Sequence, residues 1–402
     1  MKISHITATT ILDSRGRPTV SITIAAEELE ASASVPSGKS TGSREAKELR
    51  DEDGGVATVC ANIQGEIATA LATRDFESPQ ELDAFLCDLD GTSDKSRLGA
   101  NAILPISIAA TRIFAQEKGV PLWHYLAQAY NMTPGAPRLY VNMINGGAHA
   151  KFRLPFQEHI LVVGEDTLTQ SLETAAAAFA ALGDTLREGE PDLPMGDEGG
   201  YSPTFDSIER PLEVLSDIIA TNSHTMLAID AAANELLSDG AYVLLGKSYS
   251  ADELQELYVG LAAKFPFHTI EDPFAETDPE HFASLTKLLG EKIIILGDDL
   301  IVTNPDRIEW AIAGKLINGA LIKPNQIGTV SEAVEAVRSA RAANWKTVAS
   351  HRSGETDDTF IADFAYAMGM HGIKAGGLGQ KIRLEKYERL STIEHEAREL
   401  DT

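Results

Sequence analysis

The amino-acid sequence predicts an α/β fold in which the second half of the chain closes into a (β/α) barrel. Short apolar runs there end in a polar residue, and each run is followed by a stretch of helix-forming residues. The runs recur at intervals of roughly 23 to 41 residues, the length of a strand-helix unit. Six consecutive units favour a closed barrel over an open sheet, and the ends of their strands would meet at one mouth.

The N-terminal part of the chain has a different pattern, which predicts strands followed by helices. The segment TVSITIAAEELEASASVP, residues 19–36, alternates apolar and polar residues at the period of a β-strand. Residues 98–129 are rich in helix formers and are interrupted from Gly119 to Pro121, where a helix has to stop. We therefore expect an N-terminal domain over 1–130, a linker rich in proline over 131–139, and the barrel domain over 140–402.

Composition excludes several classes of function. The 402 residues include 34 Lys and Arg against 60 Asp and Glu, a formal charge of −26 that disfavours nucleic acid and anionic membranes as partners. Hydrophobic residues make up 43% of the chain, but no run is long enough to span a membrane, and the N-terminus lacks the pattern of a signal peptide. Two cysteines give neither a disulfide framework nor a zinc motif, so we expect a cytoplasmic protein.

Three of the predicted strands end in carboxylates, namely Asp230, Glu271 and Asp298. Like charges gathered at one barrel mouth favour a bound cation, and Mg²⁺ is the hard divalent ion that suits oxygen ligands. A single acidic residue in this place is more simply explained as the cap of the next helix. Three in series, followed by lysines at later strand ends, favour a metal site.

The next strands end in Lys323, His351 and Lys374. A lysine has an ordinary pKa of about 10.4 and acts as a base at neutral pH only when that pKa is lowered, which we expect Lys374 and a metal to do for Lys323. Such a site suits removal of a proton beside a carboxylate, with the developing charge held by the metal. The alternative is that Lys323 is a surface lysine whose stem packs along its strand.

Loops near the predicted mouth add further groups. Glu198 lies in the segment GDEGG, residues 196–200, where close backbone access suits a general acid. Glu158 precedes an apolar strand, and Arg352 and Ser353 follow the strand that ends in His351. Arginine suits a phosphate or carboxylate ligand because it binds either with two parallel hydrogen bonds. A solvated turn carboxylate and a salt bridge at the rim are the alternative interpretations of Glu198 and Arg352.

Segments similar to nucleotide-binding loops lack the required spacing. SGKST, residues 37–41, ends as a P-loop does, but Ala33 stands where the first glycine is needed. GAYVLLGKS, residues 240–248, has one residue too many between its glycines, and the glycines after Lys374 do not open a dinucleotide-binding unit. These observations disfavour a kinase and a nicotinamide-dependent enzyme.

Along nearly its whole length the chain resembles the enolase family. The matching segments are ILDSRGRPTV (11–20), VPSGKSTGSREAKELRD (35–51), LDGTSDKSRLGANAIL (89–104), NMINGGAHA (142–150), GDEGGYSP (196–203), IEDPFAE (270–276), GDDLIVTNP (297–305), IKPNQIGTVSEA (322–333) and SHRSGETDDTFIAD (350–363). The resemblance implies an N-terminal α+β domain that caps an α/β barrel of enolase type. It also implies Mg²⁺-dependent dehydration of 2-phosphoglycerate to phosphoenolpyruvate by a homodimer or larger homo-oligomer.

Matching motifs transfer the family's functional residues to this sequence. The catalytic residues implied are Lys323, Glu198, Glu158, Lys374 and His351. The substrate-binding residues implied are His149, Arg352, Ser353 and Gln157. The Mg²⁺ ligands implied are Asp230, Glu271, Asp298 and, for a second ion, Ser40. In this scheme Lys323 removes the proton from C2, and Glu198, assisted by Glu158, helps the 3-hydroxyl group to leave.

The chain departs from the usual family pattern in the segments that cover the substrate. The departures are Lys39 in place of alanine, the added residues Lys151, Phe152 and Arg153, and Gln380 and Ile382 in place of arginine and glutamate. The three added cations suit a further anionic group. A second hypothesis is therefore a paralogue of specialised metabolism that dehydrates a substituted phosphoglycerate, for example to form carboxyphosphonoenolpyruvate. A third, a non-catalytic binding protein, is disfavoured because no catalytic residue is lost.

Overall fold

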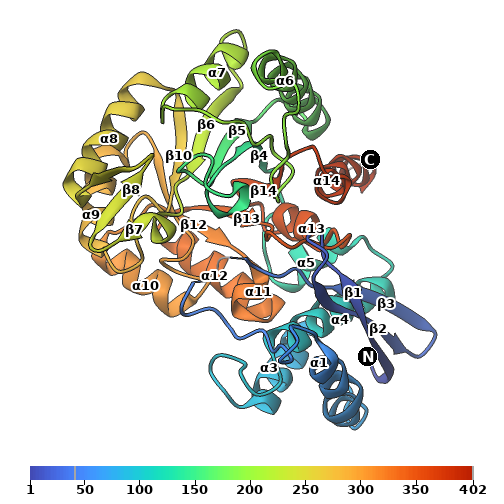
Figure 1. Cartoon of the computed structure of the whole chain (residues 1–402). Helices are drawn as coiled ribbons and strands as arrows, with labels where there is room; N and C mark the ends of the chain where they lie inside the picture. The colour runs from blue at the N-terminus through green and yellow to red at the C-terminus, as the bar shows by residue number, and fades with distance from the viewer. Residues whose placement is uncertain (40–41, 401–402) are drawn as a thin grey trace.

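A computed structural model, which describes residues 1–39 and 42–400, shows an eight-stranded closed barrel beside a smaller N-terminal domain (Figure 1). The strands follow the order β10-β11-β12-β13-β14-β4-β5-β6 around the barrel. They are β4 (Arg138–Asn145), β5 (Glu158–Val163), β6 (Thr225–Asp230), β10 (Phe267–Glu271), β11 (Ile294–Gly297), β12 (Gly319–Ile322), β13 (Lys346–Ser350) and β14 (Gly372–Gly376). The predicted fold class is confirmed.

Helices cover the outside of the barrel (Figure 1). They are α6 (Leu168–Gly189), α7 (Arg210–Ile219), α8 (Ala251–Lys264), α9 (Pro279–Leu289), α10 (Pro305–Gly314), α11 (Pro324–Ile327), α12 (Val330–Ala342), α13 (Phe360–Ala367) and α14 (Lys381–Leu400). A small antiparallel sheet follows β6 and consists of β7 (Leu237–Ser238), β8 (Ala241–Leu244) and β9 (Lys247–Tyr249). Short 3-10 helices occupy Gly147–Ala150 (η2) and Ala233–Leu236 (η3).

The six strands predicted from the apolar runs are all present and run parallel to one another. Strand β5 is different, because it runs antiparallel to both of its neighbours, β4 and β6. Residues 146–157 connect β4 to β5 at the mouth without a crossover helix, so the chain enters β5 from the mouth. Its first residue, Glu158, therefore lies opposite Asp230, the last residue of β6.

The N-terminal domain, called the cap below, places a three-stranded antiparallel sheet against helices (Figure 1). Its elements are β1 (Ile3–Leu12), β2 (Pro18–Ala26), β3 (Leu29–Ser34), α1 (Ala57–Asn62), the π-helical turn η1 (Ile63–Ile67), α2 (Ala68–Leu71), α3 (Pro79–Asp90), α4 (Ala100–Lys118) and α5 (Leu122–Ala129). The predicted helix break is confirmed, since Gly119 ends α4 with a positive φ of 65° and Pro121 precedes α5.

Buried apolar side chains fill the barrel, and one buried and one partly buried ion pair join it to the cap. The barrel interior contains Tyr140, Ile160, Val162, Ala228, Ile294, Leu296, Leu321 and Val348. Across the domain boundary, Arg352 pairs with Glu45 of the cap at 2.9 Å, and Asp358 pairs with Arg112 at 2.6 Å. These pairs fix the cap over the mouth. Among the described residues, no helix is long and apolar enough to cross a membrane.

Candidate active site

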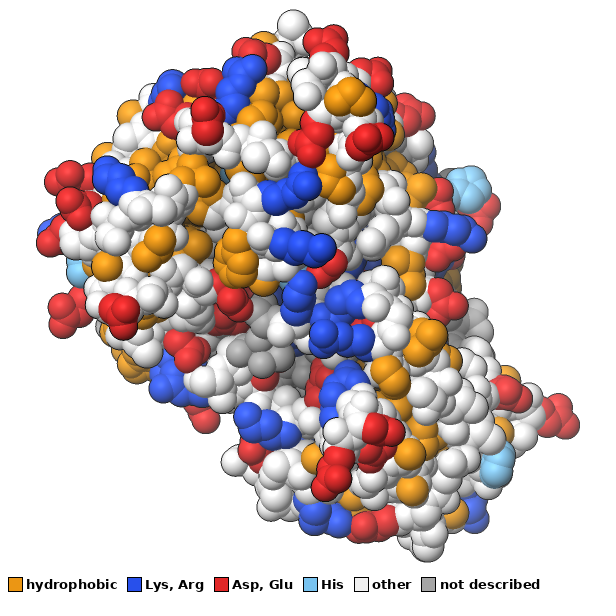
Figure 2. Space-filling view, in the orientation of Figure 1, with side chains coloured by type: hydrophobic (Ala, Val, Ile, Leu, Met, Phe, Trp, Pro, Cys, Tyr) orange, Lys and Arg blue, Asp and Glu red, His pale blue; other side chains and the backbone are white. Residues whose placement is uncertain are grey.

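One cavity at the barrel mouth contains most of the predicted site residues. Of these it is lined by His149, Gln157, Glu158, Glu198, Asp230, Asp298, Lys323, His351, Arg352, Ser353 and Lys374. Glu271 contacts Lys374 of this cavity, and Ser40 lies outside the described residues. Figure 2 shows lysine and arginine side chains gathered around the hollow between barrel and cap, which in a strongly acidic protein concentrates positive charge there.

Lys374 lies at the centre of a group of buried carboxylates. Its Nζ atom is 2.8 Å from Glu271, 3.0 Å from Asp230 and 3.3 Å from Glu158. Burial lowers the pKa of Lys374, but the three carboxylates outweigh that effect and hold the pKa well above its ordinary value. Lys374 is therefore a fixed ammonium ion, able to neutralise an anionic substrate group.

Lys323 forms an ion pair with Asp298, whose other carboxylate oxygen accepts a hydrogen bond from Gln326 at 2.9 Å. Burial lowers the pKa of Lys323, and the charge of Asp298 outweighs it, so the net pKa is raised. The expected lowering relied on Lys374 together with a metal ion, and it stays a prediction for the site with its metal bound. Arg352 and Lys374 do act in the expected direction, but the contact with Asp298 is closer and stronger.

Glu158 and Glu198 form a coupled acid pair. Burial, followed by the charge of Glu198, raises the pKa of Glu158 well above its ordinary value. Burial also acts to raise the pKa of Glu198, but the neighbouring His149 and a hydrogen bond from Glu158 hold it well below the ordinary value. Shifts in opposite directions are typical of two carboxyl groups that share a proton. Sequence reasoning placed both residues in the site but did not foresee this coupling.

Backbone packing holds Glu198 in place. The amide of Gly377 donates to the Glu198 carbonyl at 2.8 Å, and a Cβ atom at Gly377 would lie 2.3 Å from the Gly199 carbonyl oxygen. Only glycine permits this approach of the segment after β14. The Glu198 side chain then receives a hydrogen bond from Asn142 at 3.3 Å and lies 3.4 Å from His149 Nε2.

The segment from His351 to Ser353 presents groups suited to binding anions. Arg352 is 4% exposed and donates two hydrogen bonds to Glu45, at 2.9 and 3.1 Å. Burial and then the charge of Arg383 lower the pKa of His351 well below its ordinary value, so this imidazole is neutral. Ser353 Oγ accepts a hydrogen bond from Arg15 at 3.2 Å.

Sequence reasoning missed several residues that support this segment. Arg383 is fully buried, contacts His351 Nδ1, and donates to the carbonyls of Arg352 and Ser353 at 3.2 and 2.8 Å. Arg15 and Glu45 contact the segment from the cap. Arg15 and Glu45 lie within segments that match the family, and that match was the signal available for finding them.

The predicted metal ligands fit a hard cation. Asp230, Glu271 and Asp298 are all buried and offer only oxygen, and carboxyl groups outnumber cationic groups among the cavity-lining residues. Gln157 donates to Asp230 at 3.2 Å, yet its Oε1 atom has no hydrogen-bond partner among the described residues. A buried acceptor without a partner destabilises the fold, and a bound cation would remove that penalty. Asp298 also lies in a second carboxylate cluster, with Asp272 and Asp299.

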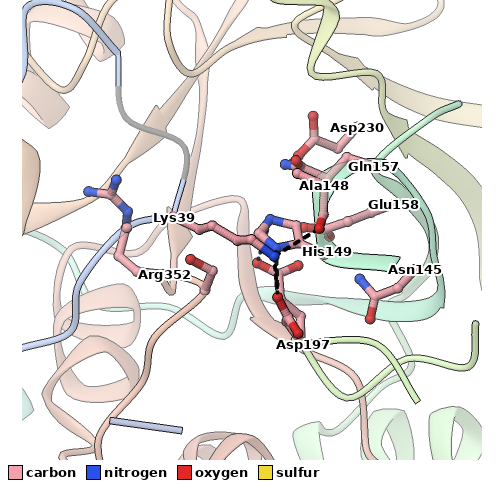
Figure 3. Close-up of polar contacts among 12 residues, drawn as sticks. Lys39, Asn145, Ala148, His149, Gln157, Glu158, Asp197, Asp230 and Arg352 are labelled. Carbon is pink, nitrogen blue, oxygen red and sulfur yellow. Dashed lines mark hydrogen bonds and ion pairs between the residues drawn. The ribbon is translucent and has the colours of Figure 1, made fainter. Parts of the chain in front are cut away.

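The three added cations do not form a free anion-binding group. Lys39 donates to Asp197 at 2.7 Å and to the Ala148 carbonyl at 2.8 Å (Figure 3). Arg153 pairs with Glu190 and donates to the Ser202 carbonyl, both at 2.9 Å. Lys151 is exposed. Because two of the three already bind acceptors within the protein, the structure does not favour the hypothesis of a more anionic substrate.

Comparison with known proteins gives a consistent assignment. The family model "Enolase, N-terminal domain" matches residues 3–126, and "Enolase, C-terminal TIM barrel domain" matches residues 135–400. Enolase of a Nitratiruptor species is 42% identical over 98% of this chain and 96% of its own length. Enolase of Methanopyrus kandleri is 41% identical with the same coverage, and Enolase B of Dictyostelium discoideum is 40% identical over 100% of this chain and 96% of its own length. The chain belongs to the enolase family of hydro-lyases.

Proposed function

We propose that the protein dehydrates 2-phosphoglycerate to phosphoenolpyruvate and requires Mg²⁺. The observation that carries the proposal is that two lysines, a coupled carboxylic-acid pair and a buried arginine line one cavity. A lysine base and a shared acid proton are the two proton-handling groups that removal of water from a 2-substituted, 3-hydroxylated carboxylate needs. The names of the relatives support the same reaction type.

Lys323 is the base in this proposal. Its ammonium is paired with Asp298 and has to release both that contact and its proton before it accepts the proton from C2. As the C2–H bond breaks, its electron pair moves toward the substrate carboxylate, whose charge the Lys374 ammonium opposes. The electrons then form the C2–C3 double bond, the C3–O bond breaks, and the hydroxyl group leaves as water with the proton held by Glu158 and Glu198.

The remaining residues bind and orient the substrate. Arg352, His351, Ser353 and His149 present donors to the phosphate and carboxylate groups. Asp230, Glu271 and Asp298 would hold Mg²⁺, and Gln157 orients Asp230 through its 3.2 Å hydrogen bond. When bound, the ion supplies positive charge that stabilises the negative charge developing on the substrate.

A direct assay tests the proposal. The purified chain is mixed with 2-phosphoglycerate, and the ultraviolet absorbance of the enol phosphate product is followed with Mg²⁺ and with excess chelator. We expect turnover only with the metal. Turnover that persists in chelator contradicts the metal requirement, and no turnover in either condition contradicts the substrate assignment.

We also propose that the protein works in the cytoplasm as a homodimer or larger homo-oligomer. Support comes from the family assignment and from Cys60 and Cys87, both of which are free thiols. Light scattering on the purified chain measures the oligomer mass, and a monomer at micromolar concentration contradicts this part of the proposal.

A further inference from the structure

Lys39 joins the cap to two loops of the barrel. The two loops are the His149 loop, residues 146–157, and the Glu198 loop, residues 195–200. The ammonium of Lys39 donates to the Ala148 carbonyl, next to His149, and to the carboxylate of Asp197, next to Glu198 (Figure 3). His149 and Glu198 both line the cavity, and Lys39 contacts the residue that precedes each of them.

The tip of the His149 loop has a strained backbone. Lys151 and Phe152 have positive φ angles of 54° and 56°, which residues other than glycine rarely adopt. Both side chains are exposed, so neither anchors the loop by burial. Leu154 and Phe156 are fully buried and anchor the later part of the loop. Its first part is held by hydrogen bonds, among them the Asp197 amide, which donates to the His149 carbonyl at 3.1 Å.

Asp197 connects the charge of Lys39 to the site. Its Oδ2 atom is 2.7 Å from Lys39 Nζ and 3.9 Å from His149 Nδ1, an atom with no hydrogen-bond partner among the described residues. The other ring nitrogen of His149 lies 3.4 Å from Glu198. A displacement of Asp197 would therefore change both the orientation of the imidazole and the position of the Glu198 loop.

We propose that Lys39 is a positioning residue that holds His149 and Glu198 in the geometry needed for departure of the substrate hydroxyl group. The kinetic part of this inference rests on the proposed function. Lys323, the proposed base, contacts Asp298 and has no contact with Lys39 among those described. Loss of Lys39 should therefore impair one half of the reaction and spare the other.

The test compares Lys39→Met, which keeps most of the side-chain length and removes the charge, with Lys39→Arg, which keeps the charge. Lys151→Met is the matched control, because it removes one positive charge from an exposed lysine of the His149 loop. Amide hydrogen exchange of the substrate-free chain is measured over residues 146–157 and 195–200. Turnover of 2-phosphoglycerate and exchange of its C2 proton with solvent are measured in parallel.

We expect Lys39→Met to speed amide exchange in both loops and to lower kcat about threefold to tenfold, the effect of losing a partly exposed ion pair and a hydrogen bond. The rate of C2 proton exchange should stay near wild type, and Lys39→Arg should restore most of the turnover. Adding Asp197→Asn to Lys39→Met should cause little further loss.

Unchanged amide exchange in Lys39→Met overturns the inference. So does an equal loss of proton exchange and turnover, or an equal effect of Lys151→Met. If wild-type protein fails to convert 2-phosphoglycerate, the proposed function is wrong, while the amide-exchange comparison still decides whether Lys39 holds the loops.

Discussion

Replacing Glu45 with glutamine removes the charged partner of a buried arginine at the boundary between the cap and the barrel. Glu45 is 7% exposed and Arg352 is 4% exposed, and two hydrogen bonds join them. Burial lowers the pKa of Arg352, but Glu45 outweighs that effect and raises it. In the variant the guanidinium stays charged because arginine is not deprotonated in proteins. The substitution therefore leaves a buried positive charge with reduced compensation.

The expected cost follows from these contacts. Removing one partner of a buried ion pair costs about 3 to 5 kcal/mol of unfolding free energy. Glutamine keeps one acceptor oxygen, and Asn325 still accepts from Arg352 at 3.0 Å, so we expect a loss of about 2 to 4 kcal/mol.

Glu48→Gln is the matched control. Glu48 is partly exposed and pairs with Arg50 at 3.2 Å, for which we expect about 0 to 1 kcal/mol.

Urea unfolding at pH 7 measures both free energies, and a turnover assay shows the effect on the site. Because Arg352 is proposed to bind the substrate, Glu45→Gln should also raise KM, whereas Glu48→Gln should leave it near wild type. The reasoning is refuted if Glu45→Gln unfolds within about 0.5 kcal/mol of wild type, or if the two variants lose equal stability.

Three further predictions concern the base, the metal and the pH dependence. Lys323→Ala should abolish exchange of the C2 proton with solvent, measured by NMR in deuterated buffer, and exchange at the wild-type rate would exclude Lys323 as the base. Asp230→Asn should lower the increase in thermal stability that Mg²⁺ gives the wild-type chain, and an unchanged increase would place the ion elsewhere. Burial lowers the pKa of His268 to about 4 and that of His371 to about 3, whereas the unfolded chain has ordinary values near 6.5, so the unfolded state binds protons first as the pH falls. Each of the two histidines should therefore lower stability from pH 6.5 to pH 4 by on the order of 3 kcal/mol, and His371→Asn should flatten this decline in urea titrations at several pH values.

The sequence by itself determined the barrel and the residues at its mouth. Short apolar runs ending in Asp230, Glu271 and Lys323 identify strands, because a parallel strand buried on both faces excludes polar residues until its end. Parallel strands joined by helices end on the same side of the barrel, so the residues that end these strands lie close together in space.

Only the tertiary structure showed how Glu158 reaches the barrel mouth. The alternation of strands and helices gives no sign that β5 runs antiparallel, and that direction alone brings its first residue to the mouth opposite Asp230. Direction depends on how residues 146–157 and the helices α6 and α7 return the chain, which local hydrophobic patterns do not record.

The charge state of the site likewise depends on the distances between its charged side chains, which only the tertiary structure provides. The sequence predicted that Lys374 and a metal lower the pKa of Lys323, but it gave no sign of the ion pair with Asp298, which acts in the opposite direction. The sequence also left Lys39 and Arg153 as surplus cations, whereas the folded chain pairs them with Asp197 and Glu190. Electrostatic interaction falls with separation and depends on burial, and both are set by contacts between residues far apart in the chain.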